Sequence, residues 1–335
     1  MIKSRTEWIE SLQEISLLAD SPIKQKNGSW EISDRKEAWK AIGPRIFDEH
    51  LDRFHKVAVA VLRERDPRIE LDENERLTAD LRGKQLKHSP LLRKGLADTL
   101  ALLGTAPKAL KSCSHGKAAV VPVLAVREIL NGADWVLWAS LNSYLPTLAE
   151  AAPDEFLDAV ERAIAQDPCP FVHVFAQEKA GIMGQNYMTG LLWGLETLAW
   201  SPDYLQRVTV ILGELAALDP GGNWANRPAN SLTEIFLPWY PQTCASISKR
   251  KAAIKALLKE QREVGWKLLF SFLPQVHSSS SGCHKPAWQK FIPEGWSDKV
   301  TNGDYWQQVI NYSELLVEVA AADSHKLATL VEHLA

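Results

Sequence analysis

The chain contains few cysteines and no long apolar run. Its four cysteines lie far apart and form no CxxC pair: Cys113, Cys169, Cys244 and Cys283. This spacing argues against a disulfide framework and is typical of reduced thiols in a cytosolic protein. No apolar run approaches the length of a membrane span, and the N-terminal stretch lacks the apolar core of a signal peptide. The sequence therefore predicts a cytoplasmic protein that does not enter a membrane.

Catalytic motifs are absent as well. Gly116-Lys117 lacks the upstream glycine and the following Ser or Thr of a phosphate-binding loop. Cys113 and His115 could suggest a Cys–His pair, but near neighbours in sequence rarely face each other, because nucleophile and base normally meet through the fold. We therefore expect no catalytic residue and no cofactor. The alternative is a helical enzyme whose acid–base residues converge only in three dimensions.

One Ser-rich stretch, HSSSSGCHKP, holds potential metal ligands. His277, Cys283 and His284 could offer imidazole and thiolate groups to zinc. A structural zinc site almost always has four ligands, and two adjacent residues are poorly placed to share one tetrahedral ion. We expect a loop here and no metal site.

The chain is also poor in basic residues in its middle. The net charge is −3, but residues 112–235 hold 6 Lys and Arg against 14 Asp and Glu. A nucleic-acid-binding groove needs clustered Lys and Arg along one surface. We therefore expect no nucleic-acid partner.

What the chain does contain is helical periodicity and 13 tryptophans, most of which we expect to pack between helices. Residues 190–222 predict two amphipathic helices joined by a turn, with Ser201 as the cap and Pro202 as the first residue of the second. In the second helix the apolar residues recur at helical spacing: Leu205, Val208, Ile211, Leu212, Leu215 and Leu218. This pair predicts an architecture built from helical hairpins.

Similar start and stop signals recur along the chain. Further helices are expected at 5–19, with Trp8 and Leu18 inward, and at 34–42, 44–62, 90–104, 118–130, 135–151 and 153–164. Residues 22–30 predict a polar loop with an Asn27-Gly28 turn. Residues 171–175, FVHVF, alternate like a strand but have no partner strand, so we expect a loop with one short helix.

These elements indicate an all-α protein. The leading prediction is an α-solenoid of degenerate helical hairpins, stacked as in TPR or HEAT proteins, and the alternative is a globular helical bundle. We expect an N-terminal helical segment at 1–111, a central hairpin array at 112–274, and an irregular loop followed by a terminal helix pair at 275–335. Apolar spacing continues to the last residues, which suggests a piece of a longer polypeptide.

Five stretches resemble the helical C-terminal regions of large bacterial STAND-type NTPases, including antiphage proteins of the Avs type. They are WKAIGPRIFDEHLDRF (39–54), HSPLLRKGLADTLALLG (88–104), GLLWGLETLAWSPDYLQRV (190–208), DPGGNWANRPANSLTEIFLPWYPQT (219–243) and GWKLLFSFLP (265–274). The resemblance implies a sensor that recognises a foreign protein and controls an attached NTPase and effector, both of which this chain lacks.

The predicted function is a non-enzymatic protein-recognition module whose partner is a foreign (phage) or host protein. An intramolecular scaffold is a further alternative. Aromatic and Arg side chains between Pro and Gly breaks are typical of interface anchors, although the same residues could cap helices and fill gaps. The predicted contact residues are Asn223, Trp224, Asn226, Arg227, Trp239 and Tyr240.

Overall fold

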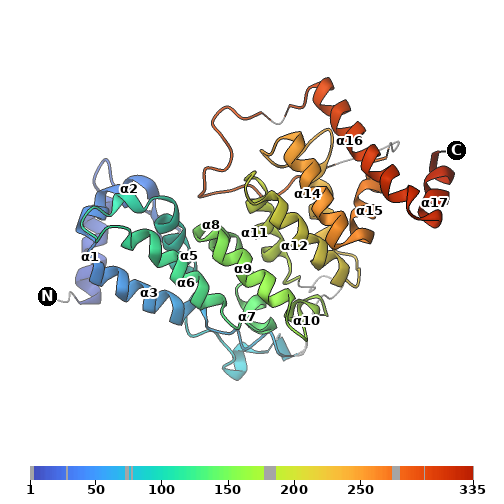
Figure 1. Ribbon diagram of the computed structural model, residues 1–335. Helices are drawn as coiled ribbons and strands as arrows, with labels where there is room; N and C mark the ends of the chain where they lie inside the picture. The colour runs from blue at the N-terminus through green and yellow to red at the C-terminus, as the bar shows by residue number, and fades with distance from the viewer. Residues whose placement is uncertain are drawn as a thin grey trace.

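The computed structural model describes residues 4–27, 29–71, 75–76, 78–176, 186–273, 280–297 and 299–334. Within these ranges it contains 16 α-helices and one two-stranded sheet, and 63% of the chain is helical (Figure 1). The predicted all-α class is confirmed.

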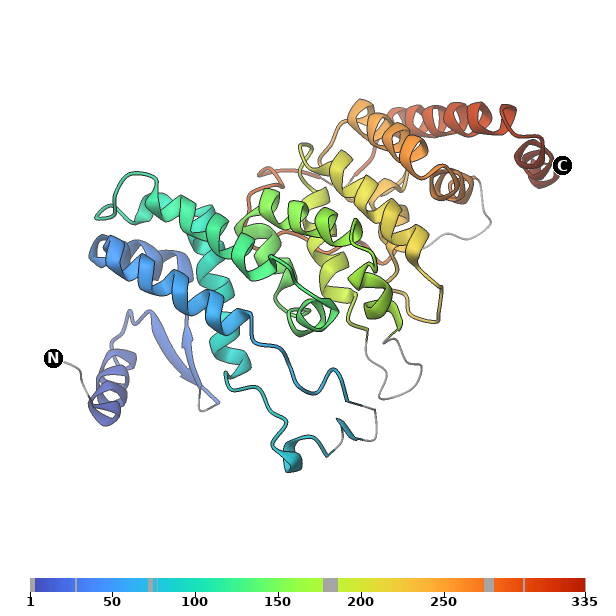
Figure 2. The ribbon, with the colours of Figure 1, turned by 60° about the horizontal axis from the view of Figure 1, so that its bottom comes forward.

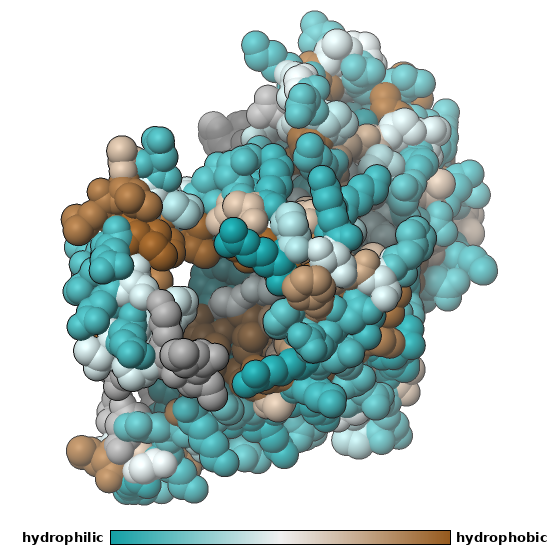
Figure 3. All heavy atoms as spheres, turned by 90° about the vertical axis from the view of Figure 1, so that its left-hand side faces the viewer, coloured by the Kyte–Doolittle hydropathy of each residue, from teal (hydrophilic) through white to brown (hydrophobic). Residues whose placement is uncertain are grey.

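The N-terminal elements differ from the expectation in two respects. The predicted loop at 22–30 is an antiparallel hairpin of β1 (Ile23–Lys26) and β2 (Ser29–Ile32), with Asn27 in the left-handed region at φ 51°. Strands of four residues are too short to show a clear alternation. Helix α1 (Arg5–Ser16) packs against β1. The side chains of Trp8, in this helix, and Leu18, just after it, are 57% and 64% exposed, so the prediction that they face inward is wrong. Apolar side chains therefore gather on this side of the molecule (Figure 3).

The next helices begin where the capping signals predict. The Asp34 side chain accepts the Glu37 N–H, and Ser89 accepts the Leu92 N–H, so both expected caps are confirmed. Pro44, expected to open the third helix, lies in a separate 3₁₀ turn. The elements of this part are α2 (Arg35–Ile42), η1 (Gly43–Arg45), α3 (Asp48–Leu62), η2 (Asp80–Arg82), α5 (Pro90–Thr105), η3 (Pro107–Ala109) and α6 (Lys117–Leu130).

The expected single helix at 135–151 is divided in two. Pro146 has no N–H to donate to the carbonyl four residues earlier, so a single helix does not continue through it. A second helix begins at Leu145 instead, with Pro146 as its second residue. FVHVF lies in a short helix, as we preferred. The elements are α7 (Trp135–Ser140), α8 (Leu145–Ala151), α9 (Pro153–Ile164) and α10 (Pro170–Ala176).

The central pair is present, but it is not the unit of packing. Ser201 does not cap the second helix: its Oγ accepts the Asp203 N–H within the turn, and the helix begins at Leu205. The elements are α11 (Thr189–Ala199), α12 (Leu205–Leu218) and α13 (Pro228–Phe236). Helix α11 packs most extensively against α8, and α12 against α14.

The last helices are α14 (Ile247–Glu260), α15 (Arg262–Ser271), α16 (Asn302–Ala321) and α17 (Ser324–Leu334). Ser246 caps α14 and Thr301 caps α16 through their side-chain oxygens. The expected irregular region followed by a helix pair is therefore present among the described residues.

The helices follow one another along the molecule, and the two ends of the chain lie at opposite extremes (Figures 1 and 2). Helix α5 packs on α6 and α8, α8 on α11, α11 on α12 and α13, α12 on α14, and α14 on α15 and α16. One buried apolar cluster runs from Ala58 to Leu330 and includes residues of all three predicted segments. The choice between a solenoid and a bundle stays a prediction, since near-neighbour packing and a shared core are compatible with both.

Two glycines allow helices to approach closely. A Cβ at Gly104 of α5 would lie 3.0 Å from the carbonyl carbon of Ala151 at the end of α8, and closer still to its oxygen. A Cβ at Gly190 of α11 would lie 2.6 Å from the carbonyl carbon of Asn142, in the turn before α8. The Gly190 N–H also donates to Asn142 Oδ1 at 2.6 Å. These contacts fix the spacing of α5, α8 and α11.

Candidate functional site

An irregular segment crosses the faces of three helices that pack in series. We call residues 280–291 the strap. In Figure 1 this orange-red segment leaves the C-terminal helices, reaches back toward α8 and returns to α16. Its polar contacts fall in order on α13, α11 and α8, where three glutamates, Glu234, Glu196 and Glu150, accept its hydrogen bonds. We call these three side chains the carboxylate row.

Glu234 of α13 holds the first part of the strap. Its carboxylate accepts the backbone N–H groups of Ser281 at 3.0 Å and Gly282 at 3.2 Å. It also accepts both neighbouring hydroxyls, those of Ser280 and Ser281. Gly282 has φ of +73°, a conformation that favours glycine.

Glu196 of α11 holds the middle of the strap through His284. Its carboxylate accepts the His284 N–H at 2.8 Å and the Ser231 hydroxyl of α13 at 2.6 Å. The imidazole stacks on Trp193, with ring centroids 5.1 Å apart, and its Nδ1 lies 3.0 Å from Thr197 Oγ1. The carbonyl of the same residue accepts the Trp200 indole N–H at 3.0 Å. Every polar group of this residue but one ring nitrogen is thus held by α11 and its C-terminal turn.

Glu150 of α8 holds the tip of the strap. One carboxylate oxygen accepts the Ala287 N–H at 3.0 Å, and the other accepts the N–H groups of Trp288 and Gln289, both at 2.7 Å. The Gln289 side chain donates to the Glu150 carbonyl at 2.8 Å. Three successive backbone donors therefore converge on one side chain that is only 1% exposed.

Burial sets the electrostatics of this row. It raises the pKa of Glu150 and of Glu196 above the usual value, although the strap's N–H groups act in the opposite direction. Burial also lowers the pKa of His284. A buried carboxylate is costly unless it is hydrogen-bonded, and here the strap supplies the donors. The row and the strap therefore depend on each other.

Side chains of the strap add a few specific contacts. The Arg35 guanidinium lies 5.6 Å from the ring centre of Trp288, and the Lys285 ammonium 5.4 Å from that of Trp200. Phe291 packs edge-on against Tyr204. Most of the recognition remains with the main chain, so this surface can hold a polypeptide that follows the same bent course with little regard to its sequence.

The predicted contact loop is held by its own internal bonds. Arg227 is buried and forms an ion pair with Asp219 at 2.5 Å. Asn226 Nδ2 donates to Thr189 Oγ1 at 3.1 Å, while Asn223 is exposed and Trp224 half-buried. These contacts favour the structural interpretation for two residues, Arg227 and Asn226.

The aromatic part of the prediction lies at the other end of α13. Trp239 is 38% exposed and stacks on Tyr240 with ring centroids 6.2 Å apart. The Tyr240 carbonyl accepts from Gln242, whose Oε1 in turn accepts the Cys283 N–H of the strap at 3.4 Å. The predicted residues thus form two groups separated by α13, and Trp239–Tyr240 is the group next to the strap.

The residues weighed as metal or catalytic groups have other roles. Burial raises the pKa of Cys283 well above its usual value, and it likewise raises that of Cys113, whose thiol donates to the Ile46 carbonyl. A reactive thiolate needs the opposite shift. His277 lies outside the described residues. Among those that are described, no three His, Cys, Asp or Glu side chains form a metal-binding group.

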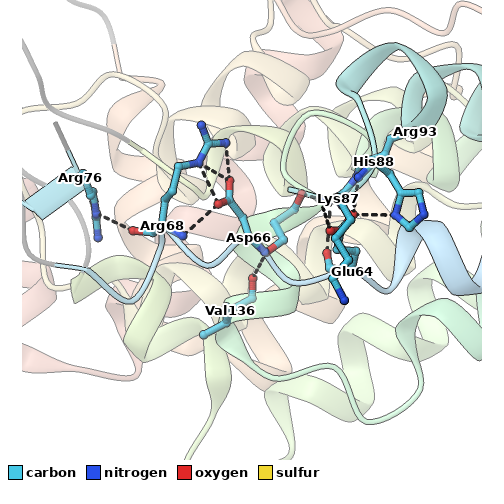
Figure 4. Close-up of polar contacts among 9 residues, drawn as sticks. Glu64, Asp66, Arg68, Arg76, Lys87, His88, Arg93 and Val136 are labelled. Carbon is cyan, nitrogen blue, oxygen red and sulfur yellow. Dashed lines mark hydrogen bonds and ion pairs between the residues drawn. The ribbon is translucent and has the colours of Figure 1, made fainter. Parts of the chain in front are cut away.

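A second polar cluster ties the connection between α3 and α5 to the helices (Figure 4). Glu64 accepts the N–H groups of Lys87 and His88, and Arg68 forms an ion pair with Asp66 at 2.7 Å. The fully buried Arg93 donates to the Glu64 carbonyl at 3.3 Å and to the Ser140 carbonyl at 3.2 Å.

The pKa values in this cluster do not favour acid–base chemistry. Burial alone would raise the pKa of Glu64 and Asp66, but their donors hold both below the usual value. A general acid at neutral pH needs a raised pKa. We therefore interpret the cluster as a structural clamp beside a cavity of about 500 Å³.

Sequence reasoning missed the carboxylate row, although a signal was present. Glu150 is the only charged residue of residues 135–153, and Glu196 is the only one of residues 186–202. A lone carboxylate in an otherwise apolar helix must be buried and must find donors. What the sequence could not indicate is that those donors come from about 90 to 140 residues further along the chain.

In the part of the chain that the structure describes, no helix is long and apolar enough to cross a membrane. Comparison with known proteins found no matching family model, no matching curated protein and no matching solved structure. The geometry of the carboxylate row and the strap therefore carries the functional argument alone.

Proposed function

We propose that this chain is a protein-recognition module that binds an irregular polypeptide segment on the face now covered by its own strap. The observation that carries this proposal is the carboxylate row. It accepts six backbone N–H groups, those of residues 281, 282, 284, 287, 288 and 289. Every polypeptide offers main-chain N–H groups, so a partner segment that adopts the same bent course could present the same donors.

The strap then acts as a tethered competitor. A segment attached to the same chain has an effective concentration of about 1 mM, so a partner must exceed that competition to displace it. The resemblance to STAND sensor regions would make the partner a foreign protein, such as one from a phage, and would place an NTPase beside the array. Both stay predictions.

The enzyme alternative would draw on the raised pKa values of Glu150 and Glu196, since shifted carboxylates often mark active sites. Both carboxylates, however, are covered by the strap and use their oxygens for its N–H groups. Protein recognition accounts for this arrangement more directly.

The test separates the strap from the face that it covers. In one variant, which we call the strap-replaced variant, His284, Ala287, Trp288 and Gln289 are replaced by proline, which has no N–H to donate, so the carboxylate row is left intact but without these donors. The probe is a fluorescent peptide with the sequence of residues 280–291, measured by fluorescence anisotropy under reducing conditions. We expect saturable binding to this variant and none to the unaltered chain, whose strap occupies the face.

Main-chain recognition is tested by N-methylation of the peptide. Methyl groups on the nitrogens of Trp288 and Gln289 remove two charge-assisted hydrogen bonds, each worth about 1.5–3 kcal/mol, so affinity should fall about 100-fold or more. The matched control is N-methylation of Lys285, whose N–H has no acceptor within the described chain. The proposal fails if the strap-replaced variant melts cooperatively but does not bind the peptide, or if both methylated peptides bind equally.

A further inference from the structure

A cavity of about 870 Å³ lies where the tip of the strap meets the N-terminal helices. Its walls come from α2, from the end of α5 with η3, and from strap residues 288–290. The volume falls within the range of small-molecule sites, about 300–1,000 Å³. The apolar part of its lining consists of Trp39, Pro44, Leu102, Ala106, Ala109 and Trp288.

The charged part of the lining is strongly basic. Five lysines face two acidic residues, which are Asp34 and Glu37. Glu37 forms an ion pair with Lys40 at 2.7 Å, and the Asp34 side chain accepts the backbone N–H of Glu37 in the first turn of α2. The other four lysines are exposed, and their ammonium groups form no ion pair or hydrogen bond in the described chain: Lys36, Lys108, Lys111 and Lys290.

This cluster does not follow from composition, because the chain as a whole has a net charge of −3. The four lysines come from three segments far apart in sequence, and the fold brings them to one opening. Like charges around a recess repel one another and concentrate anions from solution. A ligand with several negative charges would relieve that repulsion.

The residue types indicate the class of anion. Lysine offers a compact charge with freely rotating donors and is a common ligand of phosphate, and four such charges around one opening match a group that carries several negative charges. The indole of Trp39 is only 6% exposed and its N–H donates to the Ala106 carbonyl at 3.1 Å, so the half-buried Trp288 offers most of the aromatic ring surface in the cavity. We propose that the cavity binds a small phosphorylated compound that carries a flat aromatic group.

This site would couple the ligand to the strap. Trp288 and Gln289 line the cavity, and their backbone N–H groups are the two that Glu150 holds at 2.7 Å. A ligand that contacts Lys290 on the strap and Lys108 on η3 bridges the two walls. It therefore binds the seated strap more tightly than the displaced one and holds the strap in place.

The experiment uses the full chain with ATP, inorganic pyrophosphate and adenosine as probes, in titration calorimetry at about 50 mM salt, where charge screening is modest. We expect ATP to bind more tightly than pyrophosphate, and adenosine not to bind. The double variant Lys108→Ala/Lys111→Ala should lose about tenfold in ATP affinity. The matched control, Lys56→Ala/Lys267→Ala, removes two exposed lysines outside the cavity and should change it less than twofold.

Hydrogen exchange of the amides of residues 287–289 gives an independent readout. ATP should slow their exchange in the unaltered chain but not in Lys290→Ala. The proposal is overturned if neither ATP nor pyrophosphate binds, if pyrophosphate binds as tightly as ATP, or if the control variant loses as much affinity as the cavity variant. None of these outcomes bears on the peptide experiment, which uses a different probe and measures binding to the carboxylate row.

Discussion

The substitution Gly190→Ala tests whether the approach of α11 to the turn before α8 positions the carboxylate row. The new Cβ would lie 2.6 Å from the Asn142 carbonyl carbon and 2.8 Å from its Oδ1. The Asn142 carbonyl oxygen would be nearer still, so the two backbones must separate by more than about 1 Å to reach ordinary contact distances of about 3.5–4 Å. That movement would also break the hydrogen bond from the Gly190 N–H to Asn142 Oδ1.

The magnitude follows from three terms. Overpacking costs about 1–3 kcal/mol and the lost hydrogen bond about 1 kcal/mol, whereas alanine regains up to about 1 kcal/mol of helix propensity. We expect a net loss of about 2 kcal/mol, seen as a fall in melting temperature of roughly 3 °C for a chain of 335 residues. Because α11 carries Glu196 and α8 carries Glu150, the amides of the strap should also exchange faster.

The control is the same substitution at Gly95, inside α5. No atom lies within 4 Å of a Cβ built there, so Gly95→Ala should stabilise the chain by about 0.5–1 kcal/mol. Calorimetric melting of both variants decides the matter. If Gly190→Ala melts at or above the unaltered chain, the close approach does not constrain these helices and our account of the spacing is wrong.

Further predictions concern single side chains. Burial lowers the pKa of His284, so the contribution of this side chain to stability is present above its unfolded pKa and is lost as the pH falls below that unfolded pKa. Burial raises the pKa of Glu196, so the contribution of this side chain is gained as the pH falls through its raised pKa. His284→Asn and Glu196→Gln should therefore change the difference in melting temperature between pH 7.5 and 5.5 in opposite directions. Arg227→Ala leaves Asp219 unpaired and should cost about 3 kcal/mol in urea unfolding. Cys283 should react slowly with iodoacetamide in the unaltered chain and at least tenfold faster in the strap-replaced variant, which keeps Cys283, because burial raises the pKa of its thiol.

Much of the fold could be predicted from local signals. Ser89-Pro90, Asp34 and Ser246 open helices where their side chains accept backbone N–H groups, an effect that lies within a few residues. The errors arose where packing or backbone geometry overrode periodicity. Pro146 divides an apolar stretch that otherwise suits one helix, and the residues after Ser201 form a turn before α12 begins.

The candidate site was less predictable, because its partners lie far apart in sequence. Glu150 meets Ala287, and Glu196 meets His284, through the fold alone. The predicted loop Asn223–Arg227 was chosen for its residue types, and these do not reveal whether an arginine is exposed. The structure pairs Arg227 with Asp219 in the interior, where it stabilises the loop.

One part of the predicted surface nevertheless adjoins the strap. Tyr240 contacts Gln242, and Gln242 accepts the N–H of Cys283, so the aromatic pair Trp239–Tyr240 lies beside the point where the strap meets α13. A partner segment that takes the place of the strap on Glu234 would end or continue next to these rings. Main-chain donors would then supply the affinity that any extended segment shares, and the exposed aromatic rings would discriminate among sequences. Trp239→Ala should accordingly weaken binding of a true partner by about 2 kcal/mol, yet leave the binding of the strap peptide, which ends before this surface, unchanged.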